Sequence, residues 1–462
     1  MEDGGRPPHV AMLATPGMGH LIPLAELAKL LAARHGATVT LLTFASMASA
    51  TQLCAFLTSL PPSVSHETLP PVDLSDLPHD APIEALMSEE CTRSLPALAG
   101  TLAELKRTTR LVAFVTDHFC VNAFDSARDA GVGRRCLFIP GSLHALTLML
   151  HLPELVASVP GEFRDLPEPL RLPGCVPIPG LDAVFSALQD RSSPAYGMMV
   201  HLAERFRQAD TFLVNSFDAI EPEVASVLRQ PKPGRPLVYS IGPLILTAED
   251  RSTGDSDAKP PPPRAACLEW LDRQPARSVI FVSFGSGGAL PVEQMRELAL
   301  GLELSGQRFL WVVRSPTDEG SAGFIERTKG VGLMVPSWVP QIEVLAHEAT
   351  GGFLTHCGWN STLESLVHGM PMVAWPLYAE QRLNAVMLSE GVGAAIRLPE
   401  MKEKETIAEA VREVMAGEGK GAAVRAKVAE VQKAAAESLR EGGAAMAALD
   451  GVVENWAPGG NY

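Results

Sequence analysis

The feature that most constrains the fold is a strand that runs through a glycine into a helix between residues 351 and 365. We expect the strand to end at Thr355 and the helix to begin near Asn360, with His356 and Gly358 at the junction. Such a junction brings backbone N–H groups and the positive end of the helix dipole to one point. The stretch therefore predicts an anion site suited to phosphate.

Short apolar runs alternate with helical patterns along the chain. Residues 9–15 and 38–44 have the composition of buried strands, and residues 23–34 between them have helical spacing. Strand, helix and strand in this order predict a βαβ unit and a parallel sheet. The turn at 16–20 partly matches a dinucleotide-binding fingerprint, but the third glycine and the acidic residue after the second strand are missing. We therefore do not expect an NAD site.

The alternation continues to the C-terminal half and predicts an α/β protein with more than one domain. Further strands are expected at residues 111–116, 137–140, 211–215, 237–242, 278–284 and 308–314. A polar and then proline-rich stretch has the composition of an exposed connector. We predict an N-terminal domain at 1–245, a linker at 246–264, a C-terminal domain at 265–440 and a final helix and tail at 441–462.

Composition excludes several functions. The formal net charge of −15 over 462 residues argues against nucleic acid and anionic membranes as partners. The seven cysteines are scattered singly without a Cys-x-x-Cys pair, so neither a disulfide framework nor a zinc site is expected. There is no signal-peptide pattern and no apolar run of roughly 20 residues. We expect a cytoplasmic monomer.

Two residues at strand ends are candidates for acid–base chemistry. His20 opens a helix after the first strand, and Asp117 follows the strand at 111–116. Ligands of open α/β sheets bind at the carboxyl ends of the strands. A carboxylate on Nδ1–H of a histidine fixes the tautomer and leaves Nε2 as a base. Two alternatives are open: His20 could simply begin a helix, and Asp117 could cap the helix expected near 121–130.

The segment from Trp338 to Gln381 resembles the plant secondary-product glycosyltransferase signature over its whole length of 44 residues. The pattern Pro-x-x-Gly-His-x-x-Pro around His20 resembles the catalytic histidine motif of the same family, the family 1 UDP-glycosyltransferases. The similarity extends over almost the entire chain. It implies a GT-B fold, with two Rossmann-like domains facing across a cleft and the last helix packed on the N-terminal domain. It also implies transfer of a sugar from a UDP-sugar to a small acceptor.

The resemblance assigns a donor site. Trp338 and the backbone at Val339 would bind the uracil, and Gln341 and Glu364 the ribose. The diphosphate and the sugar would be held by Ser286, His356, Gly358, Trp359, Asn360, Ser361, Glu380 and Gln381. Gln381 at the last signature position implies UDP-glucose. One alternative concerns Ser361-x-x-Glu364, which is also a capping box, so Glu364 could cap the helix instead of binding ribose.

The resemblance makes His20 the general base and Asp117 its partner. His118 departs from the family, where an apolar residue often follows the aspartate. It could line the acceptor pocket or compete as a proton acceptor. The acceptor-lining regions of the family match Met87, His118, Phe119, Leu148, Met149, Phe185 and Met198. Each of these could equally be a core residue, because methionine suits an adaptable pocket and a core alike.

The expected reaction is a direct displacement that inverts the anomeric centre and gives a β-O-glucoside. Residues 70–74, 172–177 and 285–288 resemble the branch that glucosylates hydroquinone, monolignols and similar small phenols. No metal or other cofactor is expected, because Asp255-Ser256-Asp257 lies in the linker and not at a strand end. Carbon attachment to an activated ring, UDP-sugar hydrolysis or epimerisation, and a silent binding protein are the alternatives. A silent protein would be expected to lack His20 or Asp117.

Overall fold

The computed structural model describes residues 6–45, 50–78, 81–183, 185, 188–246, 265–313 and 318–456. The chain forms two compact units, Met1–Leu246 with Glu437–Tyr462, and Thr247–Ala436. The Asp-x-Asp sequence at 255–257 and nearly all of the predicted linker lie outside the described residues. Within the described ranges, no helix is both long enough and apolar enough to cross a bilayer.

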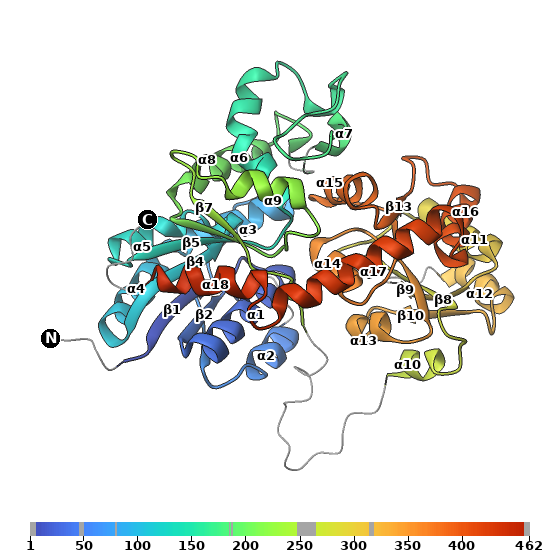
Figure 1. The fold of residues 1–462 in the computed structure, drawn as a ribbon, viewed down its shortest axis with the longest axis horizontal. Helices are drawn as coiled ribbons and strands as arrows, with labels where there is room; N and C mark the ends of the chain where they lie inside the picture. Colours follow the sequence, from blue (N-terminus) through green and yellow to red (C-terminus); the bar gives the residue numbers. More distant parts are fainter. Residues whose placement is uncertain are drawn as a thin grey trace, which may run out of the picture. The chain divides into compact units, whose positions relative to one another are not determined.

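The first unit contains a parallel sheet of seven strands with helices against it (Figure 1). The strand order is β3-β2-β1-β4-β5-β6-β7. The strands are β1 (Pro8–Leu13), β2 (Thr38–Thr43), β3 (Val64–Thr68), β4 (Arg110–Asp117), β5 (Arg134–Ile139), β6 (Thr211–Val214) and β7 (Leu237–Ser240). Leu13 at the end of β1 pairs with Thr116 near the end of β4. The segments that follow these two strands therefore start at the same edge of the sheet.

Helices connect these strands. They are α1 (Met18–His35), α2 (Ala50–Thr58), α3 (Ile83–Arg93), α4 (Leu95–Thr108), α5 (Ala123–Asp129), α6 (Leu143–Ser158), α7 (Gly180–Ala183), α8 (Pro194–Arg205) and α9 (Pro222–Arg229), with 3-10 turns η1 (His118–Cys120), η2 (Phe163–Asp165) and η4 (Phe206–Gln208). The first helix extends beyond the apolar spacing at 23–34 and begins at Met18, so the expected place of His20 at a helix start is confirmed. Gly17, with φ at 120°, precedes the helix, and the N–H of Leu21 donates to its carbonyl at 3.1 Å. Pro23 therefore lies inside α1, and His20 lies in its first turn.

The last helix belongs to the first unit. It is α18 (Ala444–Glu454), and it follows α17 (Gly419–Leu439). Leu449, Val452 and Trp456 are part of the hydrophobic core that also contains the buried face of α1. The guanidinium of Arg34 on α1 donates to the carboxylate of Asp450 at 2.7 Å. Apolar burial and an ion pair thus hold the C-terminal helix against the N-terminal sheet.

A buried carboxylate organises the start of α6. Glu221 accepts hydrogen bonds from the backbone N–H of Leu143 at 2.9 Å, the N–H of His144 at 2.8 Å and the hydroxyl of Ser216 at 2.7 Å. Its Oε1 also lies 2.7 Å from Nδ1 of His144. Burial alone would raise the pKa of Glu221, but the bond and charge of His144 and the other donors hold that pKa below its usual range. The carboxylate therefore caps α6 and ties it to α9.

We expect Glu221→Gln to lower the free energy of unfolding by about 3–5 kcal/mol at neutral pH, because donors matched to a buried carboxylate lose their partner. The folded-state pKa of Glu221 is lowered, so its contribution is present above the unfolded-state pKa and lost as pH falls through the folded-state pKa. The difference from the parent chain should therefore shrink in acid. Urea unfolding across this pH range measures it. Glu154→Gln on the exposed face of α6, the helix that Glu221 caps, is the control. Equal losses of stability in the two variants would contradict the role of Glu221.

The second unit contains a parallel sheet of six strands in the order β10-β9-β8-β11-β12-β13. They are β8 (Val279–Ser283), β9 (Arg308–Val313), β10 (Gly332–Pro336), β11 (Thr350–Thr355), β12 (Met372–Ala374) and β13 (Ala395–Arg397). The helices are α10 (Ala266–Leu271), α11 (Val292–Ser305), α12 (Asp318–Arg327), α13 (Gln341–Ala346), α14 (Trp359–Val367), α15 (Gln381–Val386), a π-helical turn η6 (Met387–Val392) and α16 (Lys404–Ala416). Ser283 pairs with Thr355, so the turns after β8 and β11 are neighbours.

One disulfide contradicts the expectation from the cysteine pattern. Cys91 on α3 and Cys120 on η1 are bonded, with their Cα atoms 5.5 Å apart. The two residues are 29 positions apart in the sequence and meet because α3 packs on the turn after β4. A single pair formed by tertiary packing has no spacing signature, so counting cysteines could not reveal it. The other five cysteines are free.

Candidate active site

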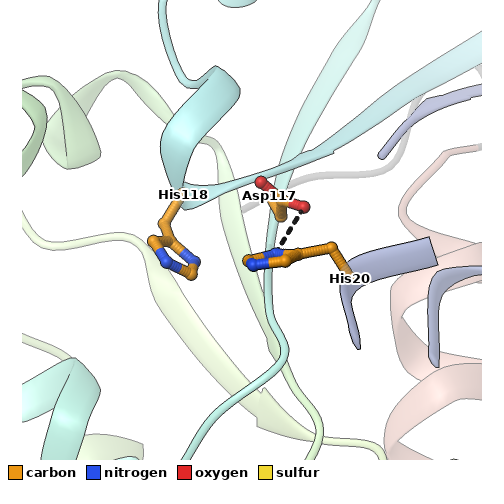
Figure 2. Close-up of side chains that lie close together, drawn as sticks. All are labelled: His20, Asp117 and His118. Carbon is orange, nitrogen blue, oxygen red and sulfur yellow. Dashed lines mark hydrogen bonds and ion pairs between the residues drawn. The ribbon is translucent and has the colours of Figure 1, made fainter. Parts of the chain in front are cut away.

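A histidine and an aspartate meet at the carboxyl edge of the first sheet (Figure 2). The distance between Nδ1 of His20 and Oδ2 of Asp117 is 3.1 Å. The Asp117 side chain is fully buried, whereas 18% of the His20 side chain is exposed. A carboxylate at this position favours the tautomer that carries its proton on Nδ1, in which Nε2 can act as a base.

The Asp117 carboxylate is held by three further donors. The backbone N–H of Thr15 donates to Oδ2 at 2.9 Å, and the Thr15 hydroxyl and the N–H of Phe119 donate to Oδ1. Burial would raise the pKa of Asp117, but the charge and hydrogen bond of His20 and the hydrogen bond of Thr15 hold that pKa below its usual range. The group is therefore a carboxylate near neutral pH. Thr15 was not among the predicted site residues, because its only signal in the sequence is its place at the end of a strand.

Asp117 also acts as a cap, as the alternative interpretation predicted, but it caps a different element from the helix expected near 121–130. Asp117 caps the 3-10 turn η1 by accepting from Phe119, whereas α5 begins after Asn122. One carboxylate thus orients the His20 ring and starts the turn that follows β4. The two interpretations of Asp117 are compatible.

His118 lies beside the pair. Its ring centroid is 5.4 Å from that of His20, and the far end of the His20 ring points toward it (Figure 2). Burial lowers the pKa of His118 to about 4. The ring is therefore neutral at neutral pH and a weak base, which argues against His118 as a competing proton acceptor.

A metal ion could be considered at this site. In the described part of the chain, only His20, Asp117 and His118 form a group of three residues whose potential metal-binding atoms lie within 4.8 Å of one another. Asp117 already accepts four hydrogen bonds with its two oxygens. A cation on this carboxylate would have to displace the His20 contact. The geometry suits a base with its orienting carboxylate better than a cation site.

Three of the predicted acceptor residues lie near the pair. Besides His118, the Phe119 ring meets His20 edge-on with centroids 5.7 Å apart. The methyl group of Met87 is 3.6 Å from the place that a Cβ on Gly17 would occupy. Of the remaining predicted residues, Leu148 and Met149 are buried in α6, and Phe185 and Met198 are partly buried.

The second set of polar residues surrounds the start of α14. The helix begins at Trp359 with Gly358 at its N-cap, and the N–H of Thr362 donates to the Gly358 carbonyl at 2.9 Å. Ser361 lies inside the first turn, so the capping-box alternative is wrong. The Glu364 carboxylate instead accepts from Nε2 of Gln341 at 2.6 Å, and the same amide donates to Ser361 at 2.9 Å.

The ring of His356 packs closely against two glycines at this junction, Gly285 and Gly358. A Cβ on Gly285 would lie 2.6 Å from Nε2 of His356, and one on Gly358 would lie 2.5 Å from the same nitrogen. Burial lowers the pKa of His356 to about 4, so the ring is neutral. Its Nδ1 is buried and has no hydrogen-bond partner among the described residues. A neutral imidazole here can donate one N–H next to the N-terminus of α14.

The backbone at this site has an unusual conformation at three positions. Ser337, Cys357 and Ala379 have φ values of 67°, 65° and 52°. Such angles are costly for residues other than glycine and cluster at functional sites. Each residue directly precedes a predicted donor residue: Trp338, Gly358 and Glu380. The sequence carried no glycine or asparagine at these positions, so pattern analysis could not find them.

Comparison with known proteins identifies the chain. Residues 241–426 match the family model described as "UDP-glucoronosyl and UDP-glucosyl transferase". A hydroquinone glucosyltransferase of Rauvolfia serpentina is 48% identical over 410 residues, which is 84% of each chain. The chain belongs to the family 1 UDP-glycosyltransferases.

Solved structures of this family have the same fold. Phytolacca americana UGT2, complexed with UDP-2fluoro-glucose and pterostilbene, is 42% identical with a TM-score of 0.89, covering 98% of this chain and 100% of the other. A Polygonum tinctorium UDP-glucosyltransferase capable of glucosylating indoxyl, in complex with 3,4-dichloroaniline, is 44% identical with a TM-score of 0.90, covering 98% and 99%. The predicted family, the GT-B fold and the prediction of a glycosyltransferase are confirmed.

In this glycosyltransferase the signature loops are connected by hydrogen bonds of Asn384, which was not predicted, and of Gln381, which was. The amide of Asn384 on α15 donates to the Cys357 carbonyl at 2.9 Å and to the Glu380 carboxylate at 3.2 Å. Oε1 of Gln381 accepts from the backbone N–H groups of Leu377 and Tyr378 at 2.9 and 3.0 Å. The spacing of Glu380 and Asn384, one helical turn apart, was the signal available in the sequence.

The signature residues of the glycosyltransferase differ in exposure. Trp338, two residues after β10, is 61% exposed, and Ser286 lies in the exposed turn after β8. Val339 and Trp359 are buried. An exposed tryptophan next to a strained backbone offers a flat face on which a base can stack.

Proposed function

We propose that this enzyme transfers glucose from UDP-glucose to a hydroxyl of a small phenol, with inversion to a β-O-glucoside. The single observation that carries the proposal is the His20–Asp117 pair, a partly exposed imidazole whose Nδ1 is held by a buried carboxylate. The names of the relatives support the donor and the acceptor class, because they describe a hydroquinone glucosyltransferase and a complex with UDP-2fluoro-glucose and pterostilbene.

We assign the donor to the start of α14 and the loops around it. Trp338 would stack on the uracil, and the backbone of Val339 would bind the edge of that base. The side chains of Gln341 and Glu364 would form hydrogen bonds with the ribose hydroxyls. The diphosphate would lie at the N-terminus of α14, where a helix favours anions. His356, Ser286, Asn360 and Ser361 would contact the phosphates, Gly358 would leave room for them, and Trp359, Glu380 and Gln381 would contact the sugar.

The chemistry follows from these two sets of residues. Nε2 of His20 removes the proton of the acceptor hydroxyl as its oxygen attacks the anomeric carbon. The bond to UDP breaks on the opposite face, and the departing diphosphate gains negative charge. Helix N–H groups and the neutral His356 N–H stabilise that charge. Asp117 stabilises the imidazolium that forms on His20. These groups supply what the displacement needs without a metal, so we propose a metal-independent reaction.

Mass spectrometry of products from UDP-glucose and a panel of phenols tests the function. We expect a glucoside only when both substrates are present, and we expect acid to cleave it, because an O-glucoside is acid-labile. Free glucose formed without a phenol would instead indicate a hydrolase. An acid-stable conjugate would indicate attachment to carbon, and no product with any phenol would refute the proposed acceptor class.

A further inference from the structure

We propose that His20 and His118 together bind a divalent transition-metal ion, with Zn²⁺ as the best fit, and that this ion inhibits the enzyme. The ion would bond to one ring nitrogen of each histidine, while Asp117 holds the other nitrogen of His20. Binding of the ion does not depend on the reaction proposed above. The inhibition rests on that reaction, because it requires His20 to be the base.

The two rings have the separation that a shared ion requires. Their centroids are 5.4 Å apart, and the far end of the His20 ring points toward His118 (Figure 2). Zinc lies about 2.0–2.1 Å from an imidazole nitrogen with tetrahedral angles, so two rings on one ion have their centres about 5 Å apart. The potential ligand atoms of His20, Asp117 and His118 lie within 4.8 Å of one another. Small rotations of the two side chains therefore suffice to bring both nitrogens onto one ion.

The hydrogen bond between His20 and Asp117 is the kind that supports a histidine ligand. A metal-bound histidine almost always donates its other ring N–H to a carboxylate, a carbonyl or water, which fixes the orientation of the ring. Nδ1 of His20 lies 3.1 Å from Oδ2 of the buried Asp117, so Nε2 is the nitrogen that faces an ion. An ion bonded to the imidazoles leaves the four hydrogen bonds of the carboxylate in place, unlike a cation on Asp117 itself.

His118 has a ring nitrogen that can form the second bond. Its Nδ1 is buried and has no hydrogen-bond partner among the described residues. An enclosed N–H without an acceptor is costly, so the neutral ring should carry its proton on Nε2 and a lone pair on Nδ1. The side chains of His20 and His118 are both partly exposed, so the ion can enter from solvent and water can complete its coordination.

The nature of the ligands selects the class of ion. Imidazole suits Zn²⁺ and other late transition metals, whereas Mg²⁺ and Ca²⁺ prefer oxygen ligands. An ion on Nε2 of His20 occupies the lone pair that would accept the proton of the acceptor hydroxyl. Zinc should therefore inhibit the transfer by blocking the base, and magnesium should not.

Calorimetric titration with Zn²⁺ in the absence of both substrates tests the site. We expect His118→Leu to bind zinc at least about tenfold more weakly than the parent chain, because loss of even an outer-shell partner typically costs about 10–100-fold in metal affinity. His118→Phe gives the same comparison if the leucine variant does not fold. His201→Gln is the matched control, because His201 is an exposed histidine whose Nε2 lies 3.2 Å from Asn122. It should bind zinc as the parent does.

Inhibition is measured as the activity that each variant loses on addition of Zn²⁺, relative to the same variant without the ion. Zinc at the dissociation constant of the parent should halve the transfer by the parent and by His201→Gln, and should leave His118→Leu nearly unaffected. Mg²⁺ at the same concentration should have no such effect. Binding of zinc to UDP-glucose affects all variants alike and cancels in this comparison.

An unchanged zinc affinity in His118→Leu and His118→Phe would overturn the inference, and so would equal inhibition of these variants and the parent. If zinc binds through His118 but does not reduce transfer, the inhibition is refuted and His20 is not the base. If the parent forms no glucoside with any phenol, the proposed function fails, and the titration still decides whether the metal site exists.

Discussion

His20→Ala should reduce kcat for glucosyl transfer to a phenol by at least about 10²-fold, because general-base catalysis contributes typically about 10²–10⁴-fold. His20 Nε2 is the candidate base, and its Nδ1 is held at 3.1 Å from a buried carboxylate. The affinity for UDP should stay the same, because the residues that we assign to the donor all belong to the second unit, whereas His20 belongs to the first. Steady-state kinetics and calorimetric titration with UDP measure the two quantities separately.

His35→Gln is the matched control for this substitution. His35 ends the same helix, α1, and its Nε2 lies 3.3 Å from Asp450, away from the strand end that carries Asp117. We expect near-normal turnover in this variant. Turnover of His20→Ala within a few-fold of the parent enzyme would exclude His20 as the base. A parallel loss of UDP affinity would show that the substitution disturbs more than the proton transfer.

Gly285→Ala should weaken UDP binding about tenfold or more. Gly285 has φ at 69°, and a Cβ at this position would lie 2.6 Å from the ring of His356. Because real contacts are never so short, the imidazole must move, and overpacking of this kind costs about 1–3 kcal/mol. The movement would take the His356 N–H away from the start of α14, where we place the diphosphate. Calorimetric titration with UDP measures the loss.

Gly306→Ala separates this packing effect from backbone strain. Gly306 also has φ at 69°, but a Cβ there would have no atom within 4 Å. It ends α11, so alanine there adds the same kind of strain, about 1–2 kcal/mol, without touching His356. We expect a lower melting temperature in both variants and weaker UDP binding in Gly285→Ala alone. Equal UDP affinities in the two variants would contradict the role of the Gly285–His356 contact.

Much of the architecture could be predicted because it depends on local patterns. Alternating apolar strands and amphipathic helices indicate parallel sheets, and the carboxyl ends of such strands collect at one edge. This is why the sequence could suggest His20 and Asp117 as partners although they are 97 positions apart. The junction at residues 351–365 could be interpreted for the same reason, since the strand, the glycine and the helix are contiguous.

The remaining features depend on tertiary contacts that leave no local pattern. The Ser361-x-x-Glu364 pattern allowed a capping box as an alternative, but the helix begins at Trp359 with Gly358 at its N-cap. Apolar spacing indicated the first helix only over residues 23–34, but the helix begins at Met18 after Gly17. The positive φ of Cys357 and the bond from Asn384 to its carbonyl are similarly invisible in the sequence. Only the folded chain shows which of two compatible local patterns is realised.

The central claim is that an acceptor oxygen activated at His20 displaces UDP directly from the anomeric carbon. The configuration of the sugar in the product tests it most directly. We expect proton NMR of the glucoside made from UDP-glucose and a simple phenol to show a β-linked anomeric centre. An α-linked product would mean that the configuration is retained and would contradict direct displacement by the activated acceptor.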